Sequence, residues 1–527
     1  MLLAIVALFI GTILFNFLFQ LAQLDLFRIY WQDVRRHGDG APTPPLPDTL
    51  PSVTIQLPMY NESAVAERIL DHAARIRYPR DRLQIQVLND STDGCTQIIE
   101  RKIEELRRAD PTLVIDYRHR LDRAGFKAGN LNAALPHVTG DLVAILDADF
   151  VPQPDFLEKT VPYFTDPQIG TVQTRWGHLN ASDSVLTRTQ EFYLDGHHSV
   201  EQRGRSAGNL YLFYNGSAGV WRTSVLRAVG GWRTDSVIED IDMSFSAQVL
   251  GFRIRFLENY VTRGELPNSI IGFRLQMFRW FKGNMQSGIK FLSTVWRQKV
   301  SVHKKIHASL QLLTPFIPVS SLVNVLSAAI LPLVLHLAPQ YEPLMALSVV
   351  GLFWFPLMFL VYGSARLRFD KKPLWWTGLL MIPRALAFLA LMVGLSCQCS
   401  VAIFEALFGT RNQWIVTPKG FSAATPGAPR KRTKMSIPWY FWLDLPIICY
   451  LAFGLSVAIT YRAYVLILME SVFLGGYLWL FCGALWEAYG PLGPSRTSPQ
   501  PASPSGPVLE PEPLPVSGPA HQVTAAG

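Results

Sequence analysis

The sequence predicts an α/β domain with a largely parallel sheet, joined to a helical membrane region. Two observations predict this fold class. Segments typical of strands and of helices alternate along the first part of residues 51–300, and long apolar segments lie before and after this range. The composition agrees, because 49% of the 527 residues are hydrophobic and only 17% are charged, which is lean for a wholly water-soluble protein.

The first element is a predicted transmembrane helix over residues 1–24, which carry no charged side chain. A cleaved signal peptide is the alternative, but neither a basic start nor a small-residue cleavage site is found in this stretch. Residues 25–50 hold three arginines and then a proline-rich stretch, so we expect a basic linker. By the positive-inside rule, the domain that follows should lie in the cytosol.

The alternation within the domain is clearest up to residue 150. The expected strands are 52–58, 83–90, 112–120 and 141–150, and the expected helices between them are 62–76, 95–108 and 129–138. In sheets of this kind, ligands bind beyond the carboxyl ends of the strands. Asp90, Asp147 and Asp149 lie at those ends, so we expect a binding site there.

Residues 301–488 are expected to form a membrane domain. Spans are predicted near 315–337, 343–363, 438–460 and 463–485. Segment 374–408 carries Pro383 and Arg384 within its apolar part, which favours an interfacial element. Together with the N-terminal helix this makes five spans, and it puts the basic loops at 364–372 and 418–434 on the cytosolic side. Residues 489–527 are rich in Pro and Ser and are predicted to be a disordered tail.

Charge and cysteine content narrow the possible partners. The formal net charge of +8 suits a membrane surface or anionic ligands. Nucleic acid is not expected as a partner, because no Lys/Arg run is interleaved with aromatic residues in the polar part. The five cysteines lack metal-ligand spacing with histidine and form no even-numbered framework, which indicates a reducing compartment.

The paired acids Asp147 and Asp149 follow an apolar run and are two residues apart, so on a strand they would point the same way. Two carboxylates at a strand end suit a hard divalent cation such as Mg²⁺, whose shell substrate phosphates often complete. The alternative is a solvated loop with two acids and no ligand. The Asp-x-Asp pattern by itself favours neither.

Two further motifs lie downstream. The stretch "SVIEDID" at 236–242 places three acids in four positions. These acids could include a general base near a metal site, or they could form the first turn of a helix, where the helix dipole stabilises negative charge. In the helical stretch 264–286, Gln276, Arg279 and Trp280 share one face. This face suits an anion and a sugar ring, although Arg and Trp also anchor helices at lipid headgroups.

With these motifs, nearly the whole chain except the tail resembles the processive family 2 glycosyltransferases of the cellulose synthase-like type, which make mannan and glucan backbones. The residues that carry the resemblance are "LPMYNE", "NDSTDG", "RAGFKAGNLN", "DADF", "VQTRWGHLN", "YNGSAGVWR", "IEDIDM", "GELP", "QMFRW" and "QWIVTPKG", in family order. Two positions depart from the pattern. Asn89 stands where an aspartate is common, and Ile238 stands where many cellulose synthases have threonine.

The resemblance implies a GT-A (Rossmann-like) glycosyltransferase domain and a role for each matching residue. Asp90, Lys127 and Asp147 would bind the nucleotide sugar, and Asp149 with Asp147 would hold Mg²⁺ or Mn²⁺. Asp240 would be the catalytic base, with Glu239 beside it. The remaining roles are acceptor binding by Trp176, Gln276 and Trp280, diphosphate binding by Arg279, and closure over the nucleotide by Thr417 and Lys419 of a gating loop, 411–420.

The function implied by the resemblance is that of a membrane-bound inverting β-glycosyltransferase. It would polymerise hexose from UDP-glucose or GDP-mannose onto a growing polysaccharide and move the product across the lipid bilayer. It would be a multi-pass protein of the plasma or inner membrane with a cytosolic catalytic domain. The alternatives are a non-processive enzyme that glycosylates a lipid, and a channel or transporter with a degenerate domain. Few ionisable residues lie in the predicted spans, which argues against the channel.

Overall fold

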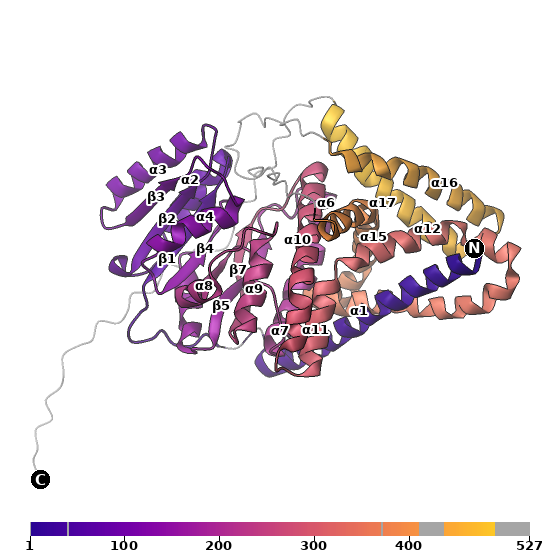
Figure 1. Cartoon of the computed structure of the whole chain (residues 1–527), viewed down its shortest axis with the longest axis horizontal. Coiled ribbons are helices and arrows are strands. Elements are labelled where there is room, and N and C mark those ends of the chain that lie inside the picture. The colour runs from indigo at the N-terminus through magenta and orange to yellow at the C-terminus, as the bar shows by residue number, and fades with distance from the viewer. Residues whose placement is uncertain (1, 39, 41, 370–372, 410–436, 491–527) are drawn as a thin grey trace, which may run out of the picture.

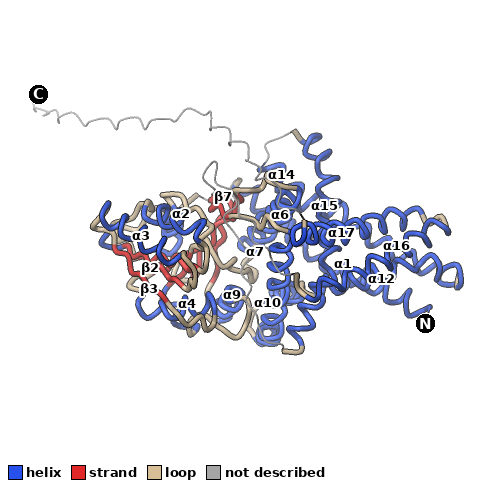
Figure 2. The backbone as a smooth tube through the Cα atoms, turned by 90° about the horizontal axis from the view of Figure 1, so that it is seen from above, coloured by secondary structure: helices blue, strands red, loops and turns tan. Residues whose placement is uncertain are grey.

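A computed structural model of the chain describes residues 2–38, 40, 42–369, 373–409 and 437–490. An α/β domain lies at one end of the molecule and long helices lie at the other, with the N-terminal residues among these helices (Figure 1). The view from above shows the same two parts, with the strands confined to the domain (Figure 2). The predicted gating loop, with Thr417 and Lys419, and residues 491–527 of the predicted tail lie outside the described residues.

The domain is built on one seven-stranded sheet in the order β3-β2-β1-β4-β6-β5-β7. The strands are β1 (Val53–Met59), β2 (Leu83–Asn89), β3 (Val114–His119), β4 (Leu142–Ile145), β5 (Ile169–His178), β6 (Gly219–Arg222) and β7 (Arg253–Gly264). The two pairings that involve β6 are antiparallel, and the other four are parallel. The α/β fold with a largely parallel sheet, predicted from the sequence, is therefore confirmed.

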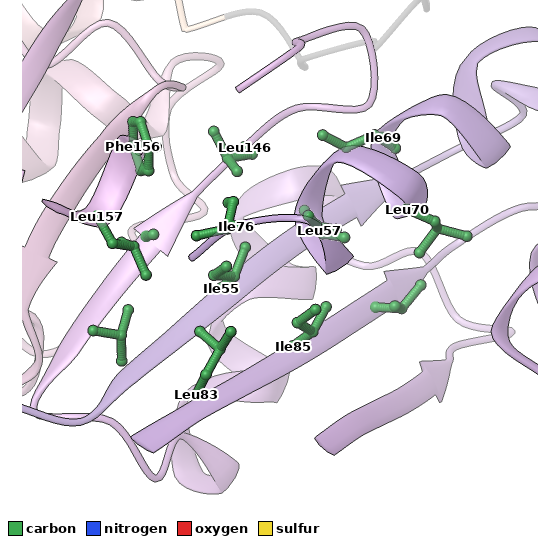
Figure 3. Packing of buried hydrophobic residues seen from close by; sticks show 14 of the residues in the cluster. Ile55, Leu57, Ile69, Leu70, Ile76, Leu83, Ile85, Leu146, Phe156 and Leu157 are labelled. Atoms are coloured by element: carbon green, nitrogen blue, oxygen red, sulfur yellow. The ribbon is translucent and has the colours of Figure 1, made fainter. Parts of the chain in front are cut away.

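Helices cover both faces of the sheet. One face is covered by α2 (Ser63–Ala74), α3 (Cys95–Ala109) and α5 (Phe156–Thr160), and the other by α4 (Phe126–Ala134), α8 (Thr223–Val229) and α9 (Glu239–Val249). Because strand side chains alternate between faces, Leu142 and Ala144 of β4 join the first core while Val143 and Ile145 join the second. Figure 3 shows part of the first core, where side chains such as Leu57 are fully buried. Each such side chain stabilises the fold by about 1.5–3 kcal/mol.

Strand β4 ends at Ile145, earlier than the predicted strand over 141–150. The residues that follow form a turn, in which the amide of Phe150 donates to the carbonyl of Asp147 at 3.0 Å. Asp147 and Asp149 therefore lie in this turn and not on a strand, so the alternation of strand side chains does not orient them. Both side chains nevertheless reach the same cavity from this turn.

One helix, α1, covers Leu2–His37, so the helix continues past residue 24, where the predicted transmembrane segment ends. No Gly or Pro lies between Gly11 and Gly38 to end the helix. The added turns pack on the rest of the protein: the side chain of Tyr30 is fully buried, and Arg203 donates to the carboxylate of Asp33 at 2.7 Å. The basic part of the expected linker is therefore a rigid connection to the domain.

Five helices among the described residues are long and apolar enough to cross a membrane, by length and composition. They are α1, α12 (Phe316–Leu337), α15 (Leu374–Leu407), the helical stretch Trp439–Thr460 that contains α16 (Asp444–Thr460), and α17 (Tyr464–Tyr489). The other helices are α6 (Val185–Gly196), α7 (Gly204–Ala207), α10 (Ile270–Arg297), α11 (Val302–Leu313), α13 (Trp354–Met358) and α14 (Ser364–Phe369), with a π-helical stretch, His197–Arg203, between α6 and α7.

Two membrane segments differ from the expectation. Residues 343–363 are not the single α-helix that the sequence predicts, because 3-10, α and π turns follow one another from Pro339 to Gly363. Residues 374–396, expected at the interface, belong to the continuous helix α15, which is one of the five candidate spans. Pro383 does not end α15, since neighbouring helices can satisfy the backbone groups that a proline frees.

The packing of these two segments also differs. Tyr341 packs with Val6 near one end of α1, and Val361 packs with Tyr30 near the other, so residues 339–363 run alongside α1. Helix α15 packs instead against α6 and along α10, where Ile403 contacts Met285. It lies between α10 and the helices α12 and α17 (Figure 1). Thus α10, the last long helix of the domain, rests on α15.

Candidate active site

A cavity lies at the carboxyl ends of β1, β2 and β4 and extends to α10. Every predicted site residue that the structure describes lines it: Asp90, Lys127, Asp147, Asp149, Trp176, Glu239, Asp240, Gln276, Arg279 and Trp280. This is the edge at which open α/β sheets bind their ligands. The residues come from segments up to 190 positions apart in the sequence (90 to 280), so folding of the whole domain assembles the cavity.

Lys127 stands at the centre of the charged groups in the cavity. It lies in the first turn of α4, which begins after Gly125 in a left-handed conformation (φ 71°). Its ammonium is 2.6 Å from Asp147 Oδ1 and 3.5 Å from Glu239 Oε1, and it donates to the carbonyl of Gly216 at 2.9 Å. Burial by itself lowers the pKa of Lys127, but Asp147 and Glu239 outweigh it and hold this pKa above its ordinary value. Lys127 is therefore a fixed cation.

Asp90 is buried at the end of β2, and both of its oxygens accept hydrogen bonds from Arg120, at 2.9 and 2.6 Å. Sequence reasoning missed Arg120. The strand register contains the signal that could have found it: Asn89 pairs with His119, so the next residues, Asp90 and Arg120, leave neighbouring parallel strands side by side. The bidentate pair holds the Asp90 carboxylate in one orientation at the cavity wall.

The turn after β4 presents two carboxylates with different surroundings. Asp147 is partly exposed and paired with Lys127, and its amide donates to Ser217 Oγ at 2.9 Å. Asp149 is only 2% exposed, and its Oδ2 accepts from the amide of Glu265 at 3.4 Å. Both line the cavity. Carboxylate oxygens are the ligands that Mg²⁺ and Mn²⁺ prefer, so the donor set fits the predicted metal.

The two candidate catalytic acids begin helix α9. Glu239 is buried and faces Lys127, whereas Asp240 is partly buried and its Oδ1 accepts from the amide of Ile241 at 2.8 Å. Burial, and then the negative charge of Glu239, raise the pKa of Asp240 well above its ordinary value, against the opposing charge of Lys127. A carboxylate with a raised pKa is a stronger proton acceptor, which is what a general base requires.

Gly216 is a site residue that sequence reasoning did not single out. It has φ 81°, a left-handed conformation that side chains rarely adopt. A Cβ atom at this position would lie 2.8 Å from Asp240 Oδ2. Glycine is therefore needed here both for the turn and for the close approach of the Asp240 carboxylate. The signal was present within "YNGSAG", as a Gly between polar residues.

Helix α10 carries Gln276, Arg279 and Trp280 along the cavity, as the three- and four-residue spacing predicts. Burial lowers the pKa of Arg279 to about 10, with the charge of Glu239 opposing this shift. The guanidinium thus stays charged at neutral pH. The helix presents a cation, an amide and an aromatic ring to one space, which suits a phosphate and a sugar.

Two other groups at the cavity wall, Arg123 and His178, were not predicted, whereas Trp176 was. The guanidinium of Arg123 lies over the ring of Tyr60, 3.3 Å from its centre. Trp176 packs edge-on against Phe150 with ring centres 5.2 Å apart, and its indole N–H donates to Ser217 O at 3.2 Å. Burial lowers the pKa of the neighbouring His178 to about 3, so this imidazole is neutral at physiological pH.

Residues 51–283 match the family described as "Glycosyltransferase like family 2". This part of the chain, which contains the sheet and the cavity, is therefore a glycosyltransferase family 2-like domain. The predicted resemblance is confirmed for this domain.

Two plant relatives are similar over the same half of the chain. "Probable glucomannan 4-beta-mannosyltransferase 6" of Oryza sativa subsp. japonica is 40% identical over 267 residues, which is 49% of this chain and 46% of that protein. "Glucomannan 4-beta-mannosyltransferase 1" of the same organism is 38% identical over 276 residues, 50% of this chain and 53% of that protein. The chain thus spans about half the length of the curated relatives it matches.

Among solved structures, the mannosyltransferase PcManGT from Pyrobaculum calidifontis, in complex with GDP-Man and Mn²⁺, has a TM-score of 0.48 and 22% sequence identity. That match covers 70% of this chain and 99% of the other.

Proposed function

We propose that the protein is a membrane-bound inverting hexosyltransferase that builds a β-linked polysaccharide from a nucleotide sugar. The observation that carries this proposal is the meeting of acids, cations and a tryptophan from distant segments around one cavity in the glycosyltransferase-like domain. Such a set offers charge for a diphosphate, a base for a hydroxyl and an aromatic face for a sugar ring.

The proposed donor is GDP-mannose, and the alternative is UDP-glucose. The names of the similar plant proteins, which are 4-beta-mannosyltransferases, support mannose. Among the described residues of the cavity, no motif distinguishes a site for GDP-mannose from a site for UDP-glucose. Both donors carry a diphosphate and a nucleoside, so the same roles for Asp90, Lys127 and Arg279 serve either.

The proposed chemistry is a single displacement at the anomeric carbon. Asp240 accepts the proton of the acceptor hydroxyl as its oxygen bonds to this carbon, and the nucleoside diphosphate leaves from the opposite face. Lys127 and Arg279, both at the cavity, stabilise the negative charge of the leaving group. Trp280, Trp176 and Gln276 orient the acceptor sugar. One displacement turns an α-linked donor into a β-linked product.

The proposed metal ligands are Asp149 and Asp147. When bound there, Mg²⁺ or Mn²⁺ would supply positive charge to the diphosphate. Glu239 pairs with Lys127, and its negative charge also acts on Arg279. We assign it a supporting role, in which it holds these two cations in place when no diphosphate is bound.

We further assign the helical part to the bilayer and the domain to the cytosol. The five apolar helices support the membrane assignment. The packing of α15 along α6 and α10 of the domain supports an interfacial position for this helix, with residues 339–363 crossing beside α1 in its place. The growing polysaccharide would then cross the bilayer between the helices proposed as spans, and it would enter this path next to α10.

The test uses the purified full chain in lipid nanodiscs. It is offered GDP-mannose, UDP-glucose or GDP-glucose with Mg²⁺ or Mn²⁺, and release of nucleoside diphosphate and product size are measured. We expect release from GDP-mannose and a β-mannanase-sensitive polymer. Short glycolipid products would favour the non-processive alternative. Failure to release diphosphate from any donor, in a sample that binds the nucleotide, would reject the transferase proposal.

A further inference from the structure

Three potential metal ligands converge outside the cavity, where α1 meets α11. Asp25 lies on α1, and His303 and His307 lie on α11. Asp25 Oδ2 is 2.7 Å from His303 Nε2 and 2.9 Å from His307 Nε2. The three ligand atoms all lie within 4.8 Å of one another. We infer that this cluster binds a divalent first-row transition metal, with Zn²⁺ as the probe.

Local sequence places the two imidazoles together. Helix α11 starts at Ser301, whose Oγ accepts from the amide of Lys304 at 3.2 Å. His303 and His307 are four residues apart on this helix and share one face, with ring centres 4.6 Å apart. Asp25 reaches the same point because α1 continues past its apolar part as a helix. Neither the two histidines of α11 nor Asp25 of α1 forms a site alone. The contact between the two helices brings the three ligands together.

The donor set selects the class of metal. Two imidazole nitrogens and one carboxylate oxygen suit Zn²⁺ and its neighbours in the series, with one position left for water. Around Zn²⁺, ligand atoms at about 2.0–2.1 Å from the metal lie about 3.3 Å from one another. The present distances of 2.7 and 2.9 Å need to widen by about half an ångström. The side chain of His303, 51% exposed, is free to make this movement.

The surroundings orient the ligands. Arg28 binds Oδ1 of Asp25, with Nε at 2.9 Å and Nη2 at 2.8 Å, which leaves Oδ2 to face the imidazoles. His307 Nδ1 and Gln311 Oε1 are both buried and have no hydrogen-bond partner in the described part of the chain. They are one turn apart on α11, so Nδ1–H can donate to Gln311 once Nε2 is a metal ligand. Such an outer hydrogen bond is usual for metal-bound histidine.

Positive charge nearby limits which cation fits. Arg28 pairs with Asp25, and the charge of Arg205 acts on His307. These charges disfavour Ca²⁺ or Mg²⁺, which would depend on the single carboxylate. A metal with strong imidazole bonds is less affected. Bound there, it would join the first apolar helix to the helix that follows α10, and so hold α10 relative to the membrane segment. The role is structural, because none of the three ligands lines the cavity.

The experiment measures zinc retained by the purified full chain after chelator treatment, incubation with Zn²⁺ and removal of the excess. An Asp149→Ala background is used, so that the catalytic cavity does not contribute. We expect one equivalent of Zn²⁺, a rise in unfolding temperature on its addition, and a visible spectrum of four-coordinate Co²⁺ after exchange. In His303→Ala and in Asp25→Asn, all three signals should be lost.

The matched control is His37→Ala. His37 also pairs with an aspartate of α1, Asp33, at 2.8 Å, but the third group there is the guanidinium of Arg203, which is not a metal ligand. This variant should retain zinc as the background protein does. His303 is half exposed, so its replacement leaves the fold intact. Equal zinc content and equal thermal shifts in the background protein and in both His303→Ala and Asp25→Asn would overturn the inference. So would the absence of zinc from the background protein itself.

Discussion

At the scale of single residues, the chemistry of the cavity depends on one partly buried cation. The ammonium of Lys127 contacts Asp147 and Glu239, and its charge reaches Asp240. The pKa of Asp240 is the quantity that this arrangement changes most directly, because burial and Glu239 raise it while Lys127 lowers it.

Replacing the proposed base tests its role. Asp240→Asn keeps the shape of the side chain and removes its ability to accept a proton. We expect turnover to fall by about 10²-fold or more, with the affinity for nucleoside diphosphate unchanged by titration calorimetry. Asp235→Asn, an exposed acid nearby, is the control and should remain near wild type. Near-normal turnover of Asp240→Asn would move the base to Glu239, the neighbouring acid that also lines the cavity.

The pH dependence tests the coupling between the two acids. Asp240 must be ionised to act, so turnover falls as the pH drops through its pKa, and this limb should lie well above pH 3.8, the ordinary pKa of an aspartate. The negative charge of Glu239 raises that pKa, so Glu239→Gln should move the acidic limb to lower pH. A pH–rate profile for both proteins measures the shift. An unmoved or upward-moved limb would contradict the assignment.

The metal assignment has its own test. Asp149→Asn preserves a hydrogen-bond acceptor at this buried position and removes the charge that a divalent cation requires. We expect Mn²⁺ binding in the presence of GDP to weaken by at least tenfold, and transfer to fall to background. Electron paramagnetic resonance of free Mn²⁺ measures the first effect. Unaltered Mn²⁺ affinity would show that Asp149 is not a ligand.

At the scale of elements, α10 links the cavity to the C-terminal helices. Glu487 of α17 accepts from the amides of Ile270 and Ile271, at 2.7 and 3.0 Å, and from Ser269 Oγ at 2.7 Å. A carboxylate at a helix N-terminus satisfies unpaired amides and favours the helix dipole. Further along, Arg274 pairs with the buried Asp444 of α16 at 2.8 Å, and Lys282 with Glu405 of α15, also at 2.8 Å. The three C-terminal helices thus set the position of α10.

Removing the cap should change the positioning of the acceptor. Glu487→Ala leaves the first amides of α10 without this partner, at a cost of about 0.5–2 kcal/mol. We expect a several-fold rise in KM for an oligosaccharide acceptor, with a smaller change in KM for the donor. Tyr489→Ala, an exposed position in the same last turn of α17, is the matched control. Equal effects of both variants would mean that the cap only stabilises the fold.

At the scale of the whole molecule, helix α15 lies between α10 of the domain and the helices α12 and α17 (Figure 1). Helix α15 has the length and composition of a span, yet it packs along α6 and α10. Hydropathy does not distinguish these positions, because an interfacial helix covered by protein on one side and lipid on the other is also apolar. Its packing on α6 and α10 supports the proposed interfacial position, although α15 packs as closely on α12 and α17.

Cysteine labelling tests this topology. Leu374 and Phe408 flank α15 and are exposed, as is Tyr464 between α16 and α17. In a background with Cys449 and Cys482 replaced, cysteines at 374 and 408 should both react with an impermeant reagent from the cytosolic side. A cysteine at 464 should react only from the other side. Labelling of 374 and 408 from opposite sides would make α15 a span.

The sequence by itself determined the strand and helix alternation and the apolar helices, because periodicity and hydropathy are local properties, and its resemblance to a family implied the cavity residues that the structure describes. It did not determine the pairing of Arg120 with Asp90, the closeness of Gly216 to Asp240, or the cap that Glu487 places on α10. Nor did it indicate that α1 continues to His37 and brings Asp25 to His303 and His307. These contacts join residues far apart in the chain, so only the packing of sheet against helix and helix against helix decides which groups meet.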